Sequence, residues 1–246
     1  MRWRPGPHLL VLVACLVAGA LALVTTALPR PRPVTAPANV FSAERAAATI
    51  RALLGDGAPH PVGSPANDAV RERLVATLEG MGLAPELQRA FMCQPWGVCA
   101  WVTNVVVELP GAAEVPAIAL SAHYDSVSAG PGAADDLQGV ATLVEGLRAL
   151  KELRGRDGPP HRPLVAVFTD GEEVGLLGAL AFTEHPRFAD VGVVINAEAR
   201  GTGGRPQMFE ASAGNHRLIG AVAQARHLPL TTSLAYEIYR RMPNDT

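Results

Sequence analysis

The 246-residue chain is 48% hydrophobic and 18% charged, with a mean hydropathy of +0.17, which excludes a disordered or fibrous protein. Its first forty residues hold four arginines and no acid, so the remainder, with 17 basic and 23 acidic residues, carries a net charge of −6. A chain of that sign offers no basic surface to phosphate groups, and we predict no nucleic-acid partner.

The N-terminal part of the chain is hydrophobic. A short basic N-terminus, residues 1–8, precedes Leu9 to Leu28, twenty uncharged residues that would span about 30 Å as a helix, the thickness of a hydrocarbon core. We expect a transmembrane helix or signal anchor over 9–28, with the rest of the chain outside the cytoplasm. The alternatives are a cleaved signal peptide, whose apolar core is usually shorter, and a lipoprotein cleavage box at residues 12–15.

Prolines mark the next segment. Pro29, Pro31, Pro33 and Pro37 favour an extended, semi-rigid linker over residues 29–40, so the folded domain is expected to cover residues 41–246.

The folded part alternates between two patterns. Helices are predicted at Ser42–Leu54, Asp68–Met81, Leu137–Leu150, Val174–His185 and Asn215–Arg226, with Ser42 and either Asn67 or Asp68 as caps. Apolar, β-branched runs predict strands at Trp101–Leu109, Val115–Ser121, Pro163–Thr169 and Val191–Asn196. This alternation predicts an α/β fold with a mostly parallel central sheet and helices on both faces. In such sheets, ligands bind beyond the carboxyl ends of the strands.

Two cysteines lie six residues apart around a Pro-Trp-Gly turn. An extracytoplasmic setting would let Cys93 and Cys99 form a small disulfide, and the alternative is two unpaired thiols. Neither has the spacing of a zinc site.

Residues with catalytic or metal-binding chemistry follow the predicted strands or precede the next helix: His123, Asp125, Asp135, Asp136, Asp170, Glu172, Glu173 and Glu198. Each alone has a structural explanation, such as capping a helix or favouring its N-terminus. Together, so many carboxylates at one sheet edge cannot all ionise without compensating positive charge. A histidine with carboxylates suits zinc, and a surplus of carboxylates suits two metals that share a bridging ligand.

These residues lie in an ordered set of motifs, PHPVGSPAND, SAHYDS, GPGAADD, FTDGEEVGLLGA and NAEARGTGG. The set resembles the clan of co-catalytic dizinc exopeptidases, and the endoplasmic reticulum metallopeptidase is the closest in pattern. The resemblance implies a zinc aminopeptidase-like three-layer sandwich with two Zn²⁺ per complete active site. It also implies a metallopeptidase, an exopeptidase and more specifically an aminopeptidase, that hydrolyses peptide bonds with a metal-bridging hydroxide and a glutamate general base; the helix expected over 9–28 would anchor it to the membrane. The partners are then a peptide substrate and the membrane.

The resemblance also assigns residues. It implies that Asp135 bridges the two zinc ions, that His123 and Glu198 complete one zinc site, and that Glu173 binds the other zinc. Many members of the clan have aspartate at the position of Glu198.

Three further residues receive roles in the same way. The resemblance implies that Glu172 is the general base and that Asp125 orients His123. It also implies that Asp136 follows Asp135 across an unusual peptide bond that can be cis.

The chain departs from the pattern at one point. The clan's last zinc ligand is a histidine downstream of a segment matched here by Met242 to Thr246, where the chain ends. His216 and His227 come before this segment, too early in the chain to be that ligand, and we place them on a predicted surface helix. We therefore expect a fragment, incomplete at its C-terminus, with one zinc site complete and the other lacking a ligand. The alternatives are an acyl transferase with one zinc, like the glutaminyl cyclases of the same architecture, and an inactive binding module.

Overall fold

The computed structural model describes residues 6–26, 30–199, 207–208, 210–224, 237–238 and 241. The chain divides into two compact units, residues 1–30 with 203–244, and residues 31–202 with 245–246. The first unit contains α1 (Pro7–Thr26) and α6 (His216–Ala223). All other elements belong to the second unit.

The N-terminal helix differs from the transmembrane helix that the sequence predicts. Among the described residues, no helix is both long and apolar enough to cross a membrane, so the transmembrane helix expected over 9–28 is not found there. The described helix α1 ends at Thr26, and residues 27–29 lie outside the described part of the chain.

The second unit is built on a five-stranded sheet in the order β1 (Glu86–Cys93), β2 (Cys99–Leu109), β4 (Leu164–Thr169), β3 (Ala117–His123) and β5 (Val191–Asn196). Strand β3 pairs in parallel with β4 and with β5, whereas β2 is antiparallel to both β1 and β4. The α/β class is confirmed, but the sheet is mixed and not mostly parallel. The difference arises at β2, which runs antiparallel to both of its neighbours, β4 and β1. The sequence pattern also missed β1, which a short turn joins to β2, so that the two strands are antiparallel.

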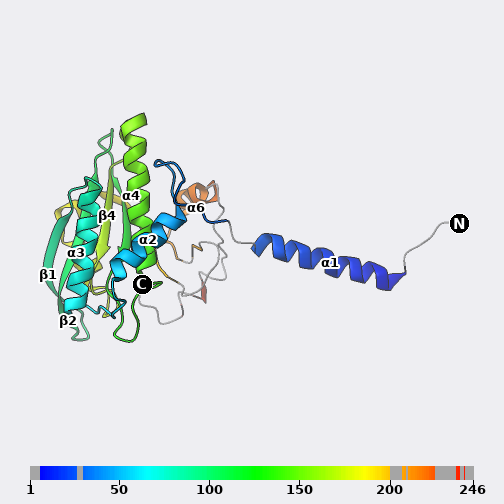
Figure 1. The fold of residues 1–246 in the computed structure, drawn as a ribbon, viewed down its shortest axis with the longest axis horizontal. Helices are drawn as coiled ribbons and strands as arrows, with labels where there is room; N and C mark the ends of the chain where they lie inside the picture. The colour runs from blue at the N-terminus through cyan, green and yellow to red at the C-terminus, as the bar shows by residue number, and fades with distance from the viewer. Residues whose placement is uncertain are drawn as a thin grey trace. The chain divides into compact units, whose positions relative to one another are not determined.

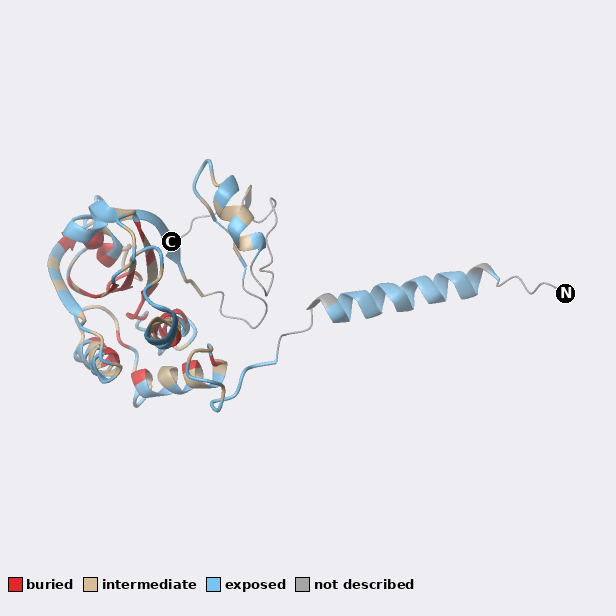
Figure 2. Cartoon of the chain, turned by 90° about the horizontal axis from the view of Figure 1, so that it is seen from above, coloured by how far each residue is buried: buried red, intermediate tan, exposed pale blue. Residues whose placement is uncertain are grey.

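Helices cover both faces of this sheet (Figure 1). On one face, α2 (Ala43–Leu54), α3 (Pro65–Gly80) and α4 (Leu137–Asp157) pack against a core that includes Val105, Tyr124 and Phe168. On the other face, α5 (Leu177–Thr183) contributes Phe182, which packs with Val106 and Val167. Figure 2 shows the buried residues in red along the strands and on the inner sides of the helices.

Several predicted boundaries shift. Helix α3 begins at Pro65, not Asp68, and its cap is the Ser64 hydroxyl, so the predicted caps Asn67 and Asp68 are wrong. Proline is preorganised for the first helical position. Helix α5 is shorter than predicted, since residues 170–176 form a loop and residues 186–190 a separate 3₁₀ turn. Helix α4 extends seven residues beyond the predicted Leu150, to Asp157.

The predicted disulfide is confirmed, since Cys93 and Cys99 are bonded across the β1–β2 turn. The cysteines pair with each other in the strand register, so the bond closes the tip of this hairpin.

The proline-rich segment is tied to the second unit by an ionic cluster. The carboxylate of Glu145, in α4, accepts hydrogen bonds from Arg45 Nε at 3.1 Å, from Arg148 and from the backbone N–H of Ser42 at 2.7 Å. Arg45 in turn donates to the carbonyls of Val34, Ala36, Pro37 and Val40. Buried Glu145 thus connects α2, α4 and residues 34–40.

Replacing Glu145 with Gln is expected to lower the free energy of unfolding by about 2 kcal/mol, because two arginines lose a charged acceptor. Burial alone would raise the pKa of Glu145, but hydrogen bonds from Arg148 and Ser42 outweigh it and lower the pKa. The stability gap between wild type and variant should therefore be complete above the ordinary glutamate pKa of about 4.3 and shrink as the pH falls through the lowered folded-state pKa.

Urea denaturation across this pH range measures that gap. Asp157→Asn serves as the control, because Asp157 pairs with Arg156 on the exposed end of α4 and should leave the unfolding midpoint unchanged. An equal effect of both substitutions would contradict the role of the Glu145 cluster.

Candidate metal centre

Three parallel strands bring the predicted site residues to one edge of the sheet. His123 ends β3 and lies beside Thr169, the last residue of β4. Glu172 and Glu173 follow β4 directly, and Glu198 follows β5. The backbone N–H of Ala197 donates to Ser121 at 2.8 Å, which holds the start of the Glu198 segment against β3.

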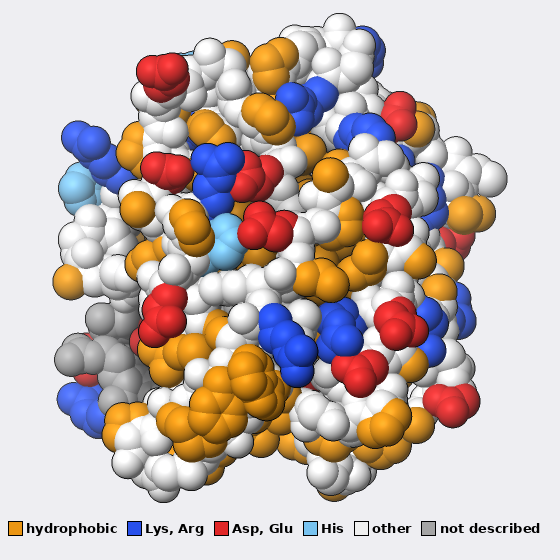
Figure 3. All heavy atoms as spheres, turned by 90° about the vertical axis from the view of Figure 1, so that its left-hand side faces the viewer, with side chains coloured by type: hydrophobic (Ala, Val, Ile, Leu, Met, Phe, Trp, Pro, Cys, Tyr) orange, Lys and Arg blue, Asp and Glu red, His pale blue; other side chains and the backbone are white. Residues whose placement is uncertain are grey.

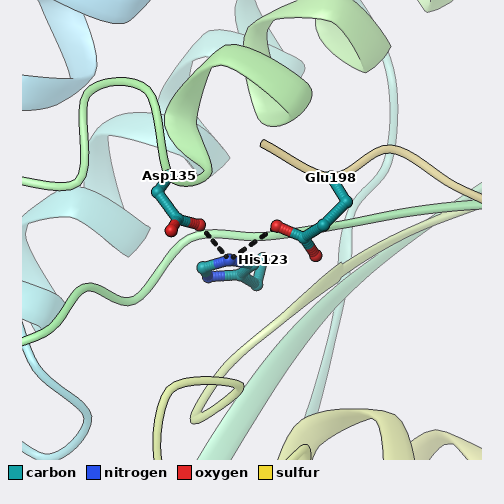
Figure 4. A group of neighbouring side chains, drawn as sticks. All are labelled: His123, Asp135 and Glu198. Carbon is teal, nitrogen blue, oxygen red and sulfur yellow. Dashed lines mark hydrogen bonds and ion pairs between the residues drawn. The ribbon is translucent and has the colours of Figure 1, made fainter. Parts of the chain in front are cut away.

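The imidazole of His123 lies at the centre of this group. Its Nε2 is 3.1 Å from Asp135 Oδ1, 3.7 Å from Glu198 Oε1 and 3.8 Å from Glu172 Oε2. Figure 4 shows the ring between two carboxylates, Asp135 from the loop before α4 and Glu198 from the segment after β5. His123 is buried, whereas the Asp135 side chain is 58% exposed, so the group is open to solvent on the Asp135 side.

The two adjacent aspartates face different ways. Asp135 points to His123, whereas Asp136 is buried and caps α4, where its Oδ1 accepts from the N–H of Gly139 at 3.0 Å. The peptide bond between them is cis. Burial raises the pKa of Asp136 to about 8. Only one of the two carboxylates therefore reaches the group around His123.

Asp125 has contacts that the sequence did not reveal. The His123 Nδ1 atom lies closer to the backbone carbonyl of Asp125, at 3.1 Å, than to its carboxylate, at 3.5 Å. The fully buried carboxylate instead accepts from the backbone N–H groups of Glu172 and Glu173, at 3.0 and 3.2 Å. Asp125 thus holds the loop after β4 as well as contacting the histidine.

The donor set fits divalent metal ions. Ligand atoms of His123, Asp135 and Glu198 lie within 4.8 Å of one another, and so do those of His123, Glu172 and Glu173. An imidazole with carboxylates is a zinc ligand set, and the exposed side of the group leaves room for water or substrate.

The electrostatics agree with a site for positive charge. Burial alone would lower the pKa of His123, but contacts with Asp125, Asp135 and Glu198 raise it well above its ordinary value. Burial and the charge of Asp135 raise the pKa of Glu173. Both shifts show that these carboxylates favour a cation among them, whether a proton on the ring or a metal ion.

A second layer of polar residues lies behind the loop that carries Glu172. Asp170 is buried, and its carboxylate accepts from the Asn67 side chain at 3.2 Å and from the N–H of Thr103 at 3.0 Å. Burial raises the pKa of Asp170 to about 6. The sequence suggested Asn67 only as a helix cap, although its place in the PHPVGSPAND motif was a signal that could have singled it out.

Some predicted features lie elsewhere. His216 is exposed at the start of α6, as expected of a surface helix. His227, the loop at residues 201–204 and Met242 to Thr246 lie outside the described residues.

Comparison with known proteins gives a consistent result. A family model described as peptidase family M28 matches residues 104–245. The vacuolar membrane protease of Candida dubliniensis is 39% identical over 110 residues, 44% of this chain and 11% of that protein. The match to this curated relative therefore spans about a tenth of that protein's length.

Solved structures share the fold. The glutaminyl cyclase of Porphyromonas gingivalis is 25% identical with a TM-score of 0.60, over 75% of this chain and 69% of that one. A leucine aminopeptidase precursor of Bacteroides thetaiotaomicron is 18% identical with a TM-score of 0.62, over 84% of both chains, a likeness of fold alone.

Proposed function

Since this chain belongs to peptidase family M28, we propose that it forms the catalytic part of a zinc-dependent exopeptidase, an aminopeptidase, acting on peptides. The observation that carries the proposal is the group around the buried His123. Carboxylate oxygens from the loop before α4 and from the segments after β4 and β5 lie 3.1–3.8 Å from its Nε2, close enough to bind metal ions together with it. Fold likeness alone would not support an activity, because unrelated reactions use one scaffold.

Two zinc ions are proposed. Asp135 would lie between them, His123 and Glu198 would hold one, and Glu173 would hold the other. Zinc held there would acidify water and polarise a carbonyl group. The proposal assigns the exposed side of the group, at Asp135, to the entering peptide.

Glu172 is proposed as the general base. Its side chain is 9% exposed and lies 3.8 Å from His123 Nε2, and its backbone N–H is fixed by Asp125. The carboxylate takes a proton from water while the water oxygen bonds to the carbonyl carbon of the peptide. The carbon–nitrogen bond then breaks, and the same carboxylate gives the proton to the leaving amine. The free amino group of the substrate would bind carboxylates near the metal centre.

The compartment is part of the proposal. Disulfides form and persist in oxidising surroundings, so the Cys93–Cys99 bond supports a place outside the cytosol for the second unit. Curated relatives named vacuolar membrane proteases support association with a membrane.

Metal content and a three-substrate assay test the function. We expect two zinc ions per complete active site and hydrolysis of an unblocked leucyl p-nitroanilide, stopped by a chelator and restored by zinc. An N-acylated dipeptide with a free carboxylate should be left intact. One zinc per site together with cyclisation of an N-terminal glutaminyl peptide would instead identify a glutaminyl cyclase, the alternative that the 25% identity to such an enzyme favours.

A further inference from the structure

The turn between β1 and β2 is joined at its ends by a disulfide and is exposed at its tip. The Cys93–Cys99 bond ties its ends, the N–H of Gln94 donates to the carbonyl of Val98 at 2.8 Å, and the N–H of Gly97 donates back to Gln94 at 2.9 Å. Trp96, at its tip, is 67% exposed. Figure 3 shows hydrophobic side chains gathered low on the face of the molecule that carries β1 and β2.

This turn contacts the loop that carries Glu172 and Glu173. The Gln94 side-chain amide donates to the carbonyl of Gly175, 81 residues away in the chain. The Trp96 ring covers the same residue: a Cβ at Gly175 would lie 2.9 Å from Trp96 Cζ2. Gly175 also has a φ of +114°, so this contact requires glycine on two counts.

Gly175 is linked directly to Glu172. The N–H groups of Gly175 and Leu176 both donate to the carbonyl of Glu172, at 2.8 and 2.9 Å. Asp125, two residues after β3, accepts from the N–H groups of Glu172 and Glu173. The loop is therefore held at two points, by Asp125 and, through Gly175, by the β1–β2 turn.

We propose that the disulfide-closed turn 93–99 is a positioning element of the active site, in which Gln94 acts through Gly175 to set the orientation of Glu172 and Glu173. This inference rests on the proposed function, because it concerns the geometry of the general base. Gln94 is a positioning residue, since its side-chain amide donates to the backbone carbonyl of Gly175.

A positioning role and a purely structural role for Gln94 predict different effects on turnover and on stability. A single hydrogen bond of this kind contributes about 1 kcal/mol to stability, a small part of the total. A catalytic group displaced by about 1 Å costs about a hundredfold in rate. Loss of the Gln94 contact should therefore affect turnover much more than folding.

Gln94→Glu is the sharpest test, since it keeps the size of the side chain but replaces the donor with a carboxylate facing the Gly175 carbonyl. Gln88→Glu is the matched control, because Gln88 lies on β1, the strand that leads into the turn, and its side-chain amide also donates to a backbone carbonyl, that of Ala181 in α5, at 2.6 Å. Both are compared with wild type in the zinc-loaded full-length protein, with leucyl p-nitroanilide as the probe. Hydrogen exchange of peptides covering residues 171–176 provides a readout independent of activity.

For Gln94→Glu we expect kcat to fall about tenfold or more with KM within about twofold, and exchange at residues 171–176 to rise about tenfold. Unchanged kcat, unchanged exchange, or an equal loss in Gln88→Glu would each overturn the inference. Absence of hydrolysis by wild type would instead refute the proposed function. In that case, the exchange result alone decides whether Gln94 restrains the loop.

Discussion

Glu172→Gln is expected to abolish most peptide hydrolysis while leaving zinc bound. The amide keeps the shape of the side chain and an oxygen acceptor but cannot take a proton from water. General-base catalysis contributes about 10²- to 10⁴-fold, so kcat should fall by that factor with little change in KM. Initial rates with leucyl p-nitroanilide and zinc content by mass spectrometry, measured on the same preparation, give both quantities.

Two further substitutions test whether the loss of kcat is specific to proton transfer by Glu172. Glu184→Gln changes an exposed glutamate after α5 and should leave kcat unaltered. Glu173→Gln should weaken zinc binding, which excess zinc in the assay would partly offset, whereas Glu172→Gln should not respond to added zinc. Hydrolysis by Glu172→Gln at the wild-type rate would remove Glu172 from the role of general base.

His123→Ala is expected to have the largest effect on metal binding. His123 is the one residue that belongs to both candidate ligand clusters among the described residues, and its side chain is nearly inaccessible to solvent. Loss of an outer-shell partner alone typically weakens metal binding by 10- to 100-fold, so loss of His123 itself should cost about 100-fold or more. Isothermal titration with zinc measures the affinity directly.

The same change should appear in thermal stability. A ligand that binds the folded state raises the melting temperature in proportion to the logarithm of its concentration over its dissociation constant. Added zinc should raise the Tm of wild type and of the control His216→Ala, whose imidazole is exposed on α6, but not that of His123→Ala. A zinc-dependent rise that survives in His123→Ala would show that the metal binds elsewhere.

Much of the fold was readable from local pattern. The apolar run Val191–Asn196 is β5 with the predicted bounds, and Ser42 caps α2 as expected. Parallel β-strands must end at a common edge, so a histidine after one and glutamates after the next two were bound to come together. The bounds of β5 and the cap of α2 were predictable because their signals, residue periodicity and capping, act over a few residues.

Tertiary structure alone decided the rest. Strand β1 was not predicted, and β2 runs antiparallel to both β1 and β4, which makes the sheet mixed. The carboxylate of Asp125 accepts from the backbone N–H of Glu172, 47 residues away in the chain, and the Gln94 side chain donates to Gly175, 81 residues away. Asn67 reached Asp170 across 103 residues. Contacts of this range depend on how helices and strands pack, and no local spacing encodes them. The residue types at the metal centre therefore come from the sequence, whereas the support that holds them in place comes from the fold.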